Sequence, residues 1–188
     1  SGGADTLNGG ANTDIASYTD ATAAVTVNLS LAGAQNTGGS GIDTLISIES
    51  LRGSSLGDTL TGSTLANVIY GMDGNDTISA GDGADRIYGG NGADTLTGGT
   101  GVDTFYFTTF EESNPLAYDT IADFVEGTDK INLSTIDPIA GGANDAFTFG
   151  AGGMLSVTQL DGMTYITADT NSNGTVDLKI ALTGLHTL

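Results

Sequence analysis

Five aspartates recur in the middle of the chain at intervals of nine or eighteen residues: Asp58, Asp76, Asp85, Asp94 and Asp103. Each ends a glycine-rich turn, and Asn67 occupies the equivalent place once. Carboxylates and turn carbonyls are the hard oxygen ligands of calcium, which takes about six to eight of them at roughly 2.3–2.6 Å. This spacing of acids therefore indicates a repeated calcium site.

The acids belong to six consecutive nine-residue units that fill residues 53–106, namely GSSLGDTLT, GSTLANVIY, GMDGNDTIS, AGDGADRIY, GGNGADTLT and GGTGVDTFY. Each unit consists of a six-residue turn and a three-residue strand with an apolar centre. The glycines suit places where φ is positive or where two backbones approach closely. Because one apolar side chain per strand cannot form a core, the units must stack, with alternate units on the same side of a flattened coil.

Stacking brings acids together. With strands about 4.8 Å apart, two carboxylates eighteen residues apart face the same gap and repel each other unless a cation lies between them. We therefore expect calcium to join neighbouring coils.

The pattern GGxGxDxUx, in which U is apolar, resembles the RTX repeats of secreted bacterial calcium-binding proteins, which wind into a parallel β-roll. The resemblance implies an all-β fold, with a calcium-loaded β-roll over residues 1–106 and an excursion from it at about 18–37. The segment 107–188 is expected to be an antiparallel, β-rich C-terminal cap. Its Asp161-Gly162 pair predicts a two-residue hairpin.

The resemblance also implies the ligands, because in RTX proteins one ion takes the second, fourth and sixth residues of one turn and the first, third and sixth of the next turn on that side. Carried over to this chain, the first set is Ser54, Leu56, Asp58, Gly71, Asp73 and Asp76. The second set is Met72, Gly74, Asp76, Gly89, Asn91 and Asp94, and the third is Gly81, Gly83, Asp85, Gly98, Thr100 and Asp103. A fourth set, Ser63, Leu65, Asn67, Ala80, Asp82 and Asp85, is expected to be weak or empty because Asn67 brings no charge.

Two more sites are expected outside the regular array. If residues 18–36 only enlarge one coil, then Gly10, Asn12 and Asp14 face Gly38, Ser40 and Asp43. The run YDTIADFVEGTDKINL at 118–133 resembles the segment that follows the repeats in serralysin-type metalloproteases and other type I secretion substrates. In those proteins its first acid helps to close the last site, so Asp119 is expected to face Gly90, Gly92 and Asp94; the alternative is a surface aspartate.

A third candidate is the loop DTNSNGTVD at 169–177. It has oxygen-bearing side chains at positions one, three, five and nine, but no glutamate at position twelve. It is either a calcium loop or a turn rich in asparagine and glycine.

Composition limits the partners. The 188 residues carry 23 acids against four basic side chains, a net charge of −19 that excludes binding to nucleic acid or to an anionic membrane surface. No apolar run is long enough to span a bilayer. The absence of cysteine fits a secreted, metal-stabilised protein, although a cytosolic protein without disulfides would look the same.

Catalytic motifs are missing from the sequence. There is no HExxH and no cysteine, and His186 is the one histidine. A polysaccharide-active enzyme that uses acids alone stays open as an alternative. The outward strand positions offer rows of threonine on one face and of tyrosine on the other, which could bind an ordered surface such as ice, sugar rings or a protein, or could simply be good strand formers.

The sequence therefore predicts a calcium-binding module of a bacterial protein that is exported by type I secretion and folds on calcium outside the cell. Residues 1–8 match the end of a nonapeptide, which predicts further repeats or an effector domain upstream. Two alternatives are a surface-layer, adhesin or polysaccharide-binding module that associates with itself or with a glycan, and the C-terminal part of a secreted hydrolase such as a metalloprotease.

Overall fold

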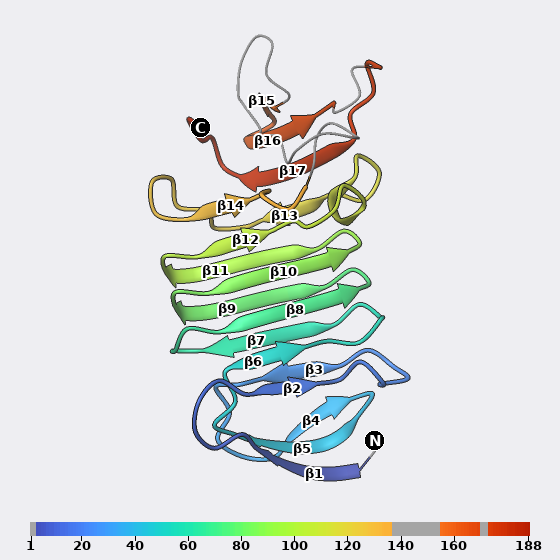
Figure 1. The fold of residues 1–188 in the computed structure, drawn as a ribbon, viewed down its shortest axis with the longest axis vertical. Helices are drawn as coiled ribbons and strands as arrows, with labels where there is room; N and C mark the ends of the chain where they lie inside the picture. Colours follow the sequence, from blue (N-terminus) through green and yellow to red (C-terminus); the bar gives the residue numbers. More distant parts are fainter. Residues whose placement is uncertain (1–2, 137–154, 170–172) are drawn as a thin grey trace.

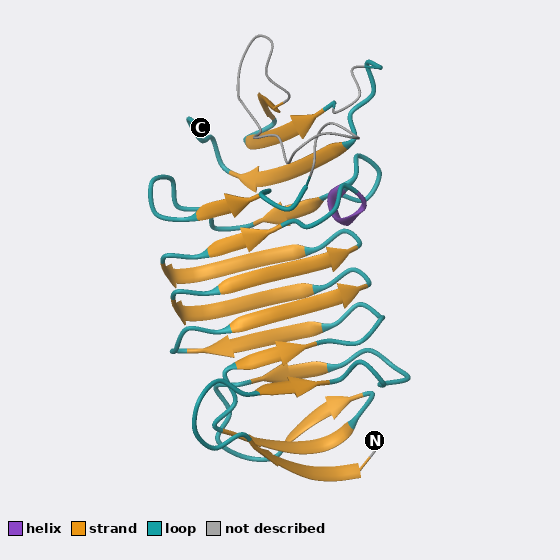
Figure 2. Ribbon diagram, viewed as in Figure 1, coloured by secondary structure: helices purple, strands orange, loops and turns teal. Residues whose placement is uncertain are grey.

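The computed structural model describes residues 3–136, 155–169 and 173–188, and almost all of its regular structure is β-sheet. Figure 1 shows a stack of short strands that runs along the long axis of the molecule. In Figure 2 the 3₁₀ turn η1 (Glu111–Ser113) stands out as a helical segment among the strands.

Two sheets face each other across the stack. One contains, in spatial order, β2 (Ile15–Ser17), β6 (Ser50–Arg52), β8 (Val68–Asp73), β10 (Arg86–Asn91), β12 (Thr104–Tyr106) and β14 (Lys130–Asn132). The other contains β3 (Thr26–Asn28), β7 (Thr59–Ser63), β9 (Thr77–Gly83), β11 (Thr95–Gly101), β13 (Asp119–Ile121), β17 (Leu178–Thr183), β16 (Met163–Ala168) and β15 (Leu155–Leu160). The chain alternates between the two sheets, as the flattened coil requires.

The register of the coils is the predicted eighteen residues. Ile69 pairs with Ile87 and Ile87 with Phe105 in one sheet, and all three side chains are fully buried. Leu60, Ile78 and Leu96 form the equivalent row in the other sheet. The core is thus a double row of single apolar side chains between the sheets, which explains why one inward residue in nine is sufficient.

The N-terminal part differs from the prediction. The unit at 38–46, expected to stack on residues 9–17, lies in a separate three-stranded sheet with the order β1 (Gly3–Asn8), β5 (Gly41–Ile46), β4 (Gln35–Gly38). Strand β5 pairs in parallel with β1, because both carry the same Gly-x-Asp-x-Leu pattern. The strand that stacks on β2 is instead β6, and β3 joins the roll from within the expected excursion.

The parallel ladders also continue past Tyr106, where antiparallel strands were expected. Strand β13 is parallel to β11, and β14 is parallel to β12. Among the described strands after Tyr106, the antiparallel pairs are β15 to β16 and β16 to β17. The predicted hairpin is confirmed, since Leu160 pairs with Met163 and the turn residues Asp161 and Gly162 have φ values of 53° and 79°. The run DAFTFG at 145–150, also expected to be a strand, lies outside the described residues.

Candidate metal centre

The acids that end the turns form two buried ladders, one along each edge of the roll. In the first ladder the backbone N–H of one acid donates to Oδ1 of the acid in the next coil, Asp58 to Asp76 at 2.7 Å, Asp76 to Asp94 at 2.8 Å and Asp94 to Asp119 at 2.9 Å. In the second ladder the corresponding bonds run from Asn67 to Asp85 at 2.7 Å, Asp85 to Asp103 at 2.9 Å and Asp103 to Asp129 at 3.1 Å. Each carboxylate is therefore positioned by the coil before it.

The second carboxylate oxygen is left without a partner in five of these acids. Among the described residues no hydrogen bond reaches the buried Oδ2 atom of Asp76, Asp85, Asp94, Asp103 or Asp119. Burial of a charged oxygen without compensation is costly. A cation or a proton must therefore accompany these atoms in the folded state.

The pKa values of the same groups reflect this cost. Burial raises the pKa of Asp76 to about 7 and that of Asp85 and of Asp94 to about 6. Burial, and next the charge of Asp94, raises the pKa of Asp119 to about 9. Without a cation, these side chains take up protons at a pH where a free carboxylate has lost its own.

We therefore expect acid to favour folding of the metal-free chain. A raised folded-state pKa contributes stability below the ordinary value of 3.8, and that stability is lost as the pH rises through about 6 to 7. In EGTA, the β signal in circular dichroism should grow as the pH falls from 8 to 5. A β signal that declines over this range would contradict the ladder electrostatics.

Glycines at the first place of the turns leave room beside the unpartnered oxygens. A Cβ atom on Gly71 would lie 2.2 Å from Oδ2 of Asp76, and one on Gly89 would lie 2.4 Å from Oδ2 of Asp94. Each Oδ2 thus lies against bare backbone. Among the described residues no three His, Cys, Asp or Glu side chains gather at one point, so a metal here would rely on two carboxylates and on backbone carbonyls. That donor set suits calcium rather than a transition metal.

The structure brings together the facing turns of all four regular ligand sets. Turn 71–76 lies between turns 53–58 and 89–94. It contacts the first, because a Cβ added to Gly74 would lie 2.5 Å from the carbonyl carbon of Leu56. It contacts the second, because a Cβ added to Gly90 would lie 1.8 Å from the backbone oxygen of Met72. On the other edge, a Cβ on Gly81 would lie 2.2 Å from the oxygen of Ser63.

In these sets, the side chains of one aspartate and one asparagine already have hydrogen-bond partners within the protein. Oδ2 of Asp58 accepts the backbone N–H of Ser54 at 2.6 Å. The side-chain oxygen of Asn67 accepts the N–H of Ser63 at 2.7 Å, and its amide nitrogen donates to the carbonyl of Glu49 at 2.9 Å. The first set, with Asp58, and the fourth, with Asn67, therefore each have one buried carboxylate oxygen without a partner, whereas the second and third have two.

Asp119 lies beside Asp94, one of the three residues that it was expected to face, while its contacts with Gly90 and Gly92 stay a prediction. It is fully buried beside Asp94, and a Cβ on Gly89 would lie 3.3 Å from its Oδ2. The alternative of a surface aspartate is wrong.

The site expected from Gly10, Asn12 and Asp14 together with Gly38, Ser40 and Asp43 is not assembled. Asp43 lies beside Asp5, whose N–H donates to its Oδ1 at 3.3 Å, and the Thr37 hydroxyl donates to its Oδ2 at 2.9 Å. Asp14 lies beside Glu49 instead, with its N–H 3.1 Å from Oε2. The pairing of β5 with β1 separates the two halves of the predicted site.

Two acids that extend the ladder and the turns were missed by the sequence analysis. Asp129 continues the second ladder, and its Oδ2 accepts the N–H of Val125 at 2.8 Å. Asp123 accepts the N–H groups of Gly98 and Gly99 at 2.9 and 2.8 Å, which closes the last turn of the array. The signal for Asp129 was the triplet Asp-Lys-Ile, which matches the Asp-x-apolar part of the repeat.

The loop at 169–177 behaves as a turn in its described part. The Asp169 carboxylate accepts the N–H groups of Asn173 and Gly174 at 3.2 and 2.8 Å. Residues 170–172 lie outside the described residues, so the calcium-loop reading stays a prediction.

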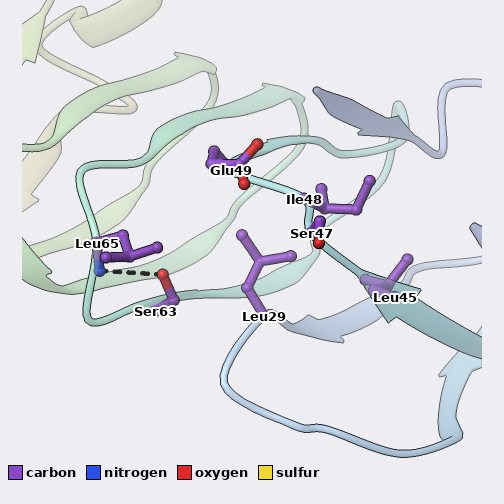
Figure 3. A pocket seen from close by; sticks show the side chains of 7 residues that line it. All are labelled: Leu29, Leu45, Ser47, Ile48, Glu49, Ser63 and Leu65. Atoms are coloured by element: carbon purple, nitrogen blue, oxygen red, sulfur yellow. Dashed lines mark hydrogen bonds between the residues drawn. The ribbon is translucent and has the colours of Figure 1, made fainter. Parts of the chain in front are cut away.

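A small hollow lies where the repeat period breaks near the N-terminal end of the roll (Figure 3). Its lining is mostly apolar, with Glu49 as the one acid among Leu29, Leu45, Ser47, Ile48, Ser63 and Leu65. It offers no group of acids, and the carboxylate ladders are therefore the stronger candidate site. Within the described parts of the chain, no helix is long and apolar enough to cross a membrane.

The parallel coils, the glycine turns and the paired acids together define a β-roll of the RTX class. The chain belongs to the peptidase M10 serralysin C-terminal family, whose model matches residues 7–188. This family comprises the non-catalytic C-terminal part of peptidase M10 proteins. Among curated proteins, none matches the chain.

Two of the solved structures that share the fold are subunits of the mannuronan C5-epimerase of Azotobacter vinelandii. The AlgE6R3 subunit is 30% identical with a TM-score of 0.55, and the match covers 69% of this chain and 71% of that one. The AlgE6R2 subunit is 32% identical with a TM-score of 0.52, and the match covers 71% of this chain and 83% of that one.

Proposed function

We propose that the chain is the calcium-binding module of a secreted bacterial protein, and that calcium triggers its folding outside the cell. The observation that carries the proposal is the row of buried Oδ2 atoms without hydrogen-bond partners. Asp76, Asp94 and Asp119 would hold calcium on one edge, and Asp85 and Asp103 on the other. Bound calcium would neutralise the facing carboxylates and link neighbouring coils.

The same features argue that the metal-free chain does not fold near neutral pH. Thirty glycines and a net charge of −19 make the folded state costly in chain entropy and in repulsion. Metal binding then supplies the folding free energy. Extracellular modules bind calcium at about 10⁻⁴–10⁻³ M, a range that would leave the chain unfolded in the cytosol.

Export by type I secretion is part of this proposal, and the serralysin family match supports it. A chain that stays unfolded until it meets extracellular calcium suits passage through a narrow export channel. The parent protein would carry its activity in an upstream domain, for which a metallopeptidase is the first candidate. The antiparallel strands β15–β17 would cover the end of the roll, since β17 occupies the open edge of β13.

Circular dichroism at pH 7.5 tests the proposal. In EGTA the β signal should be largely absent, and it should appear cooperatively on addition of millimolar calcium. Magnesium at equal concentration should not replace calcium, because it demands tighter octahedral geometry at about 2.0–2.1 Å. A β signal that is the same in EGTA and in calcium would refute calcium-triggered folding.

A further inference from the structure

The first two turns of the regular array, 53–58 and 62–67, differ in backbone conformation from the turns that follow. In the later turns the residues at the second and fourth places all have a positive φ, between 89° at Met72 and 144° at Gly101. The residues at these places in the first two turns do not have a positive φ; they are Ser54, Leu56, Ser63 and Leu65. The second and fourth places are two of the three that each turn is expected to offer to an ion. The carbonyls of the first two turns are therefore not oriented like those of the later turns.

The Ser54 hydroxyl closes the first turn from within. It donates to Oδ1 of Asp58 at 2.9 Å and accepts the N–H of Leu56 at 3.1 Å. The N–H groups of Ser54 and Val25 also donate to the buried Asp58 carboxylate, at 2.6 and 2.8 Å, so that both of its oxygens have partners. Hydrogen bonds to a charged acceptor are strong, and these donors stabilise the carboxylate without a cation.

Ser63 closes the second turn in the same way. Its N–H and its hydroxyl donate to Oδ1 of Asn67 at 2.7 and 3.1 Å. The Ser63 oxygen accepts the N–H of Leu65 at 3.2 Å, the bond drawn as a dashed line in Figure 3. Because asparagine carries no charge, this turn has no carboxylate for an ion to neutralise.

The coil formed by residues 53–70 is therefore satisfied by its own hydrogen bonds. No buried side-chain nitrogen or oxygen within it lacks a partner. Carboxylates with such an oxygen lie on either side of the coil, at Asp14 before it and from Asp76 onwards after it. Strands that precede the regular array also hold the coil, since β7 pairs with β3 and β8 with β6. Within the regular array, the need for a cation begins after residue 70.

We propose that serine hydroxyls replace calcium in the turns of coil 53–70, and that this coil is the last part of the regular array to open as calcium is withdrawn. The inference rests on the calcium-triggered folding proposed above. In a stack of repeats, each coil is stabilised by its own contacts and by its neighbours. Coils that need ions open first, while the serine-closed coil stays paired with β3 and β6. Two repeats are too few to stay folded alone, so this coil also opens in EGTA.

Hydrogen exchange of the full chain, followed by mass spectrometry at pH 7.5 over a series of calcium concentrations, measures the order of opening. The comparison is between β7 and β11, which lie in the same sheet on either side of β9. Protection of β7 should be half lost at a calcium concentration at least about threefold below that for β11. The S54A/S63A variant should raise the midpoint of β7 to that of β11.

The matched control removes two hydroxyls from the same turns. Ser55 and Thr64 occupy the third places of these turns and are exposed. The S55A/T64A variant should leave both midpoints where they are in the parent protein, because neither hydroxyl closes a turn.

A second variant should gain a calcium site. S54G/L56G gives the first turn glycine at both places where the later turns have a positive φ, and it keeps the charge of Asp58. Native mass spectrometry should detect one more bound calcium ion than in the parent protein. The S54A/L56A variant loses the same side chains without gaining glycine and should bind no more ions than the parent.

The outcomes distinguish this inference from calcium-triggered folding itself. A parent chain that binds no calcium, or a β11 that is equally protected in EGTA and in calcium, would refute both. The inference alone is overturned if β11 folds on calcium but β7 loses protection at the same or a higher calcium concentration. It is also overturned if the S54G/L56G variant gains no ion.

Discussion

Replacement of Asp94 by Asn should raise the calcium concentration at the midpoint of folding by at least tenfold. Asp94 is central in its ladder, where its Oδ1 accepts the N–H of Asp76 and its own N–H donates to Asp119. Asparagine keeps the shape and the Oδ1 acceptor but removes one of two charged ligands from each of two neighbouring sites. Removal of one partner from a buried charged pair costs about 3–5 kcal/mol, and a tenfold change in binding corresponds to about 1.4 kcal/mol.

The sign of this effect separates a metal site from a purely structural ladder. If no cation binds, the substitution relieves repulsion between buried carboxylates and should stabilise the chain. The exposed Asp20 provides the matched control, because Asp20→Asn makes the same charge change away from both ladders and should leave the midpoint unmoved. A midpoint for Asp94→Asn at or below that of the parent protein would count against calcium ligation.

Replacement of Gly90 by Ala should destabilise the calcium-loaded chain by more than about 4 kcal/mol, an effect in the exceptional range for one methyl group. Gly90 has a φ of 101°, and an added Cβ would lie 1.8 Å from the carbonyl oxygen of Met72 in the preceding coil. The two turns would have to move apart, which would also separate the carbonyls that face the same gap.

Gly127 is the matched control for this substitution. Its φ is 78° and nothing lies within 4 Å of the position of an added Cβ, so Gly127→Ala reports the cost of positive φ alone, about 1–2 kcal/mol. Urea unfolding in saturating calcium measures both variants. Equal losses for the two variants would show that close stacking of the turns is not what requires glycine at position 90.

The regular part of the roll could be predicted because a single sequence period determines where its strands, turns and facing acids lie. Once Ile69, Ile87 and Phe105 must share a core, the strands, the turns and the facing acids follow from a coil of eighteen residues. The close approach of backbones in the turns explains why the repeat carries glycine at positions such as 74 and 90. The facing turns of the four regular sets could therefore be predicted, although the hydrogen bonds that satisfy Asp58 and Asn67 could not. That these residues bind calcium stays a prediction.

The N-terminal pairing could not be predicted from the period. Strand β5 carries the pattern of Gly41, Asp43 and Leu45, which fits more than one partner strand equally well. Its choice of β1 depends on the whole path of the chain through residues 18–37, where β3 forms roll pairing without any repeat motif. Competition between equivalent partners is a tertiary effect, and local sequence does not decide it.

Asp129 was missed for a related reason. It lies 26 residues after Asp103 instead of eighteen, because a longer connection replaces the glycine-rich turn before it. The triplet Asp-Lys-Ile keeps the acid and the strand of the repeat. The glycine-rich turn that marks a repeat in the sequence is absent before it. A search for Asp-x-apolar triplets without fixed spacing would have found Asp129 as well as Asp119, which the resemblance to the serralysin-type segment had already suggested.

The most direct test of the central claim is a crystal structure grown in millimolar calcium, with anomalous scattering used to identify the metal. We predict ions between the stacked turns that carry Asp76, Asp94 and Asp119 and between those that carry Asp85 and Asp103, at about 2.3–2.6 Å from Oδ2 of Asp94 and of Asp103. Water at these positions, or carboxylates rotated to form new hydrogen bonds within the protein, would contradict the account.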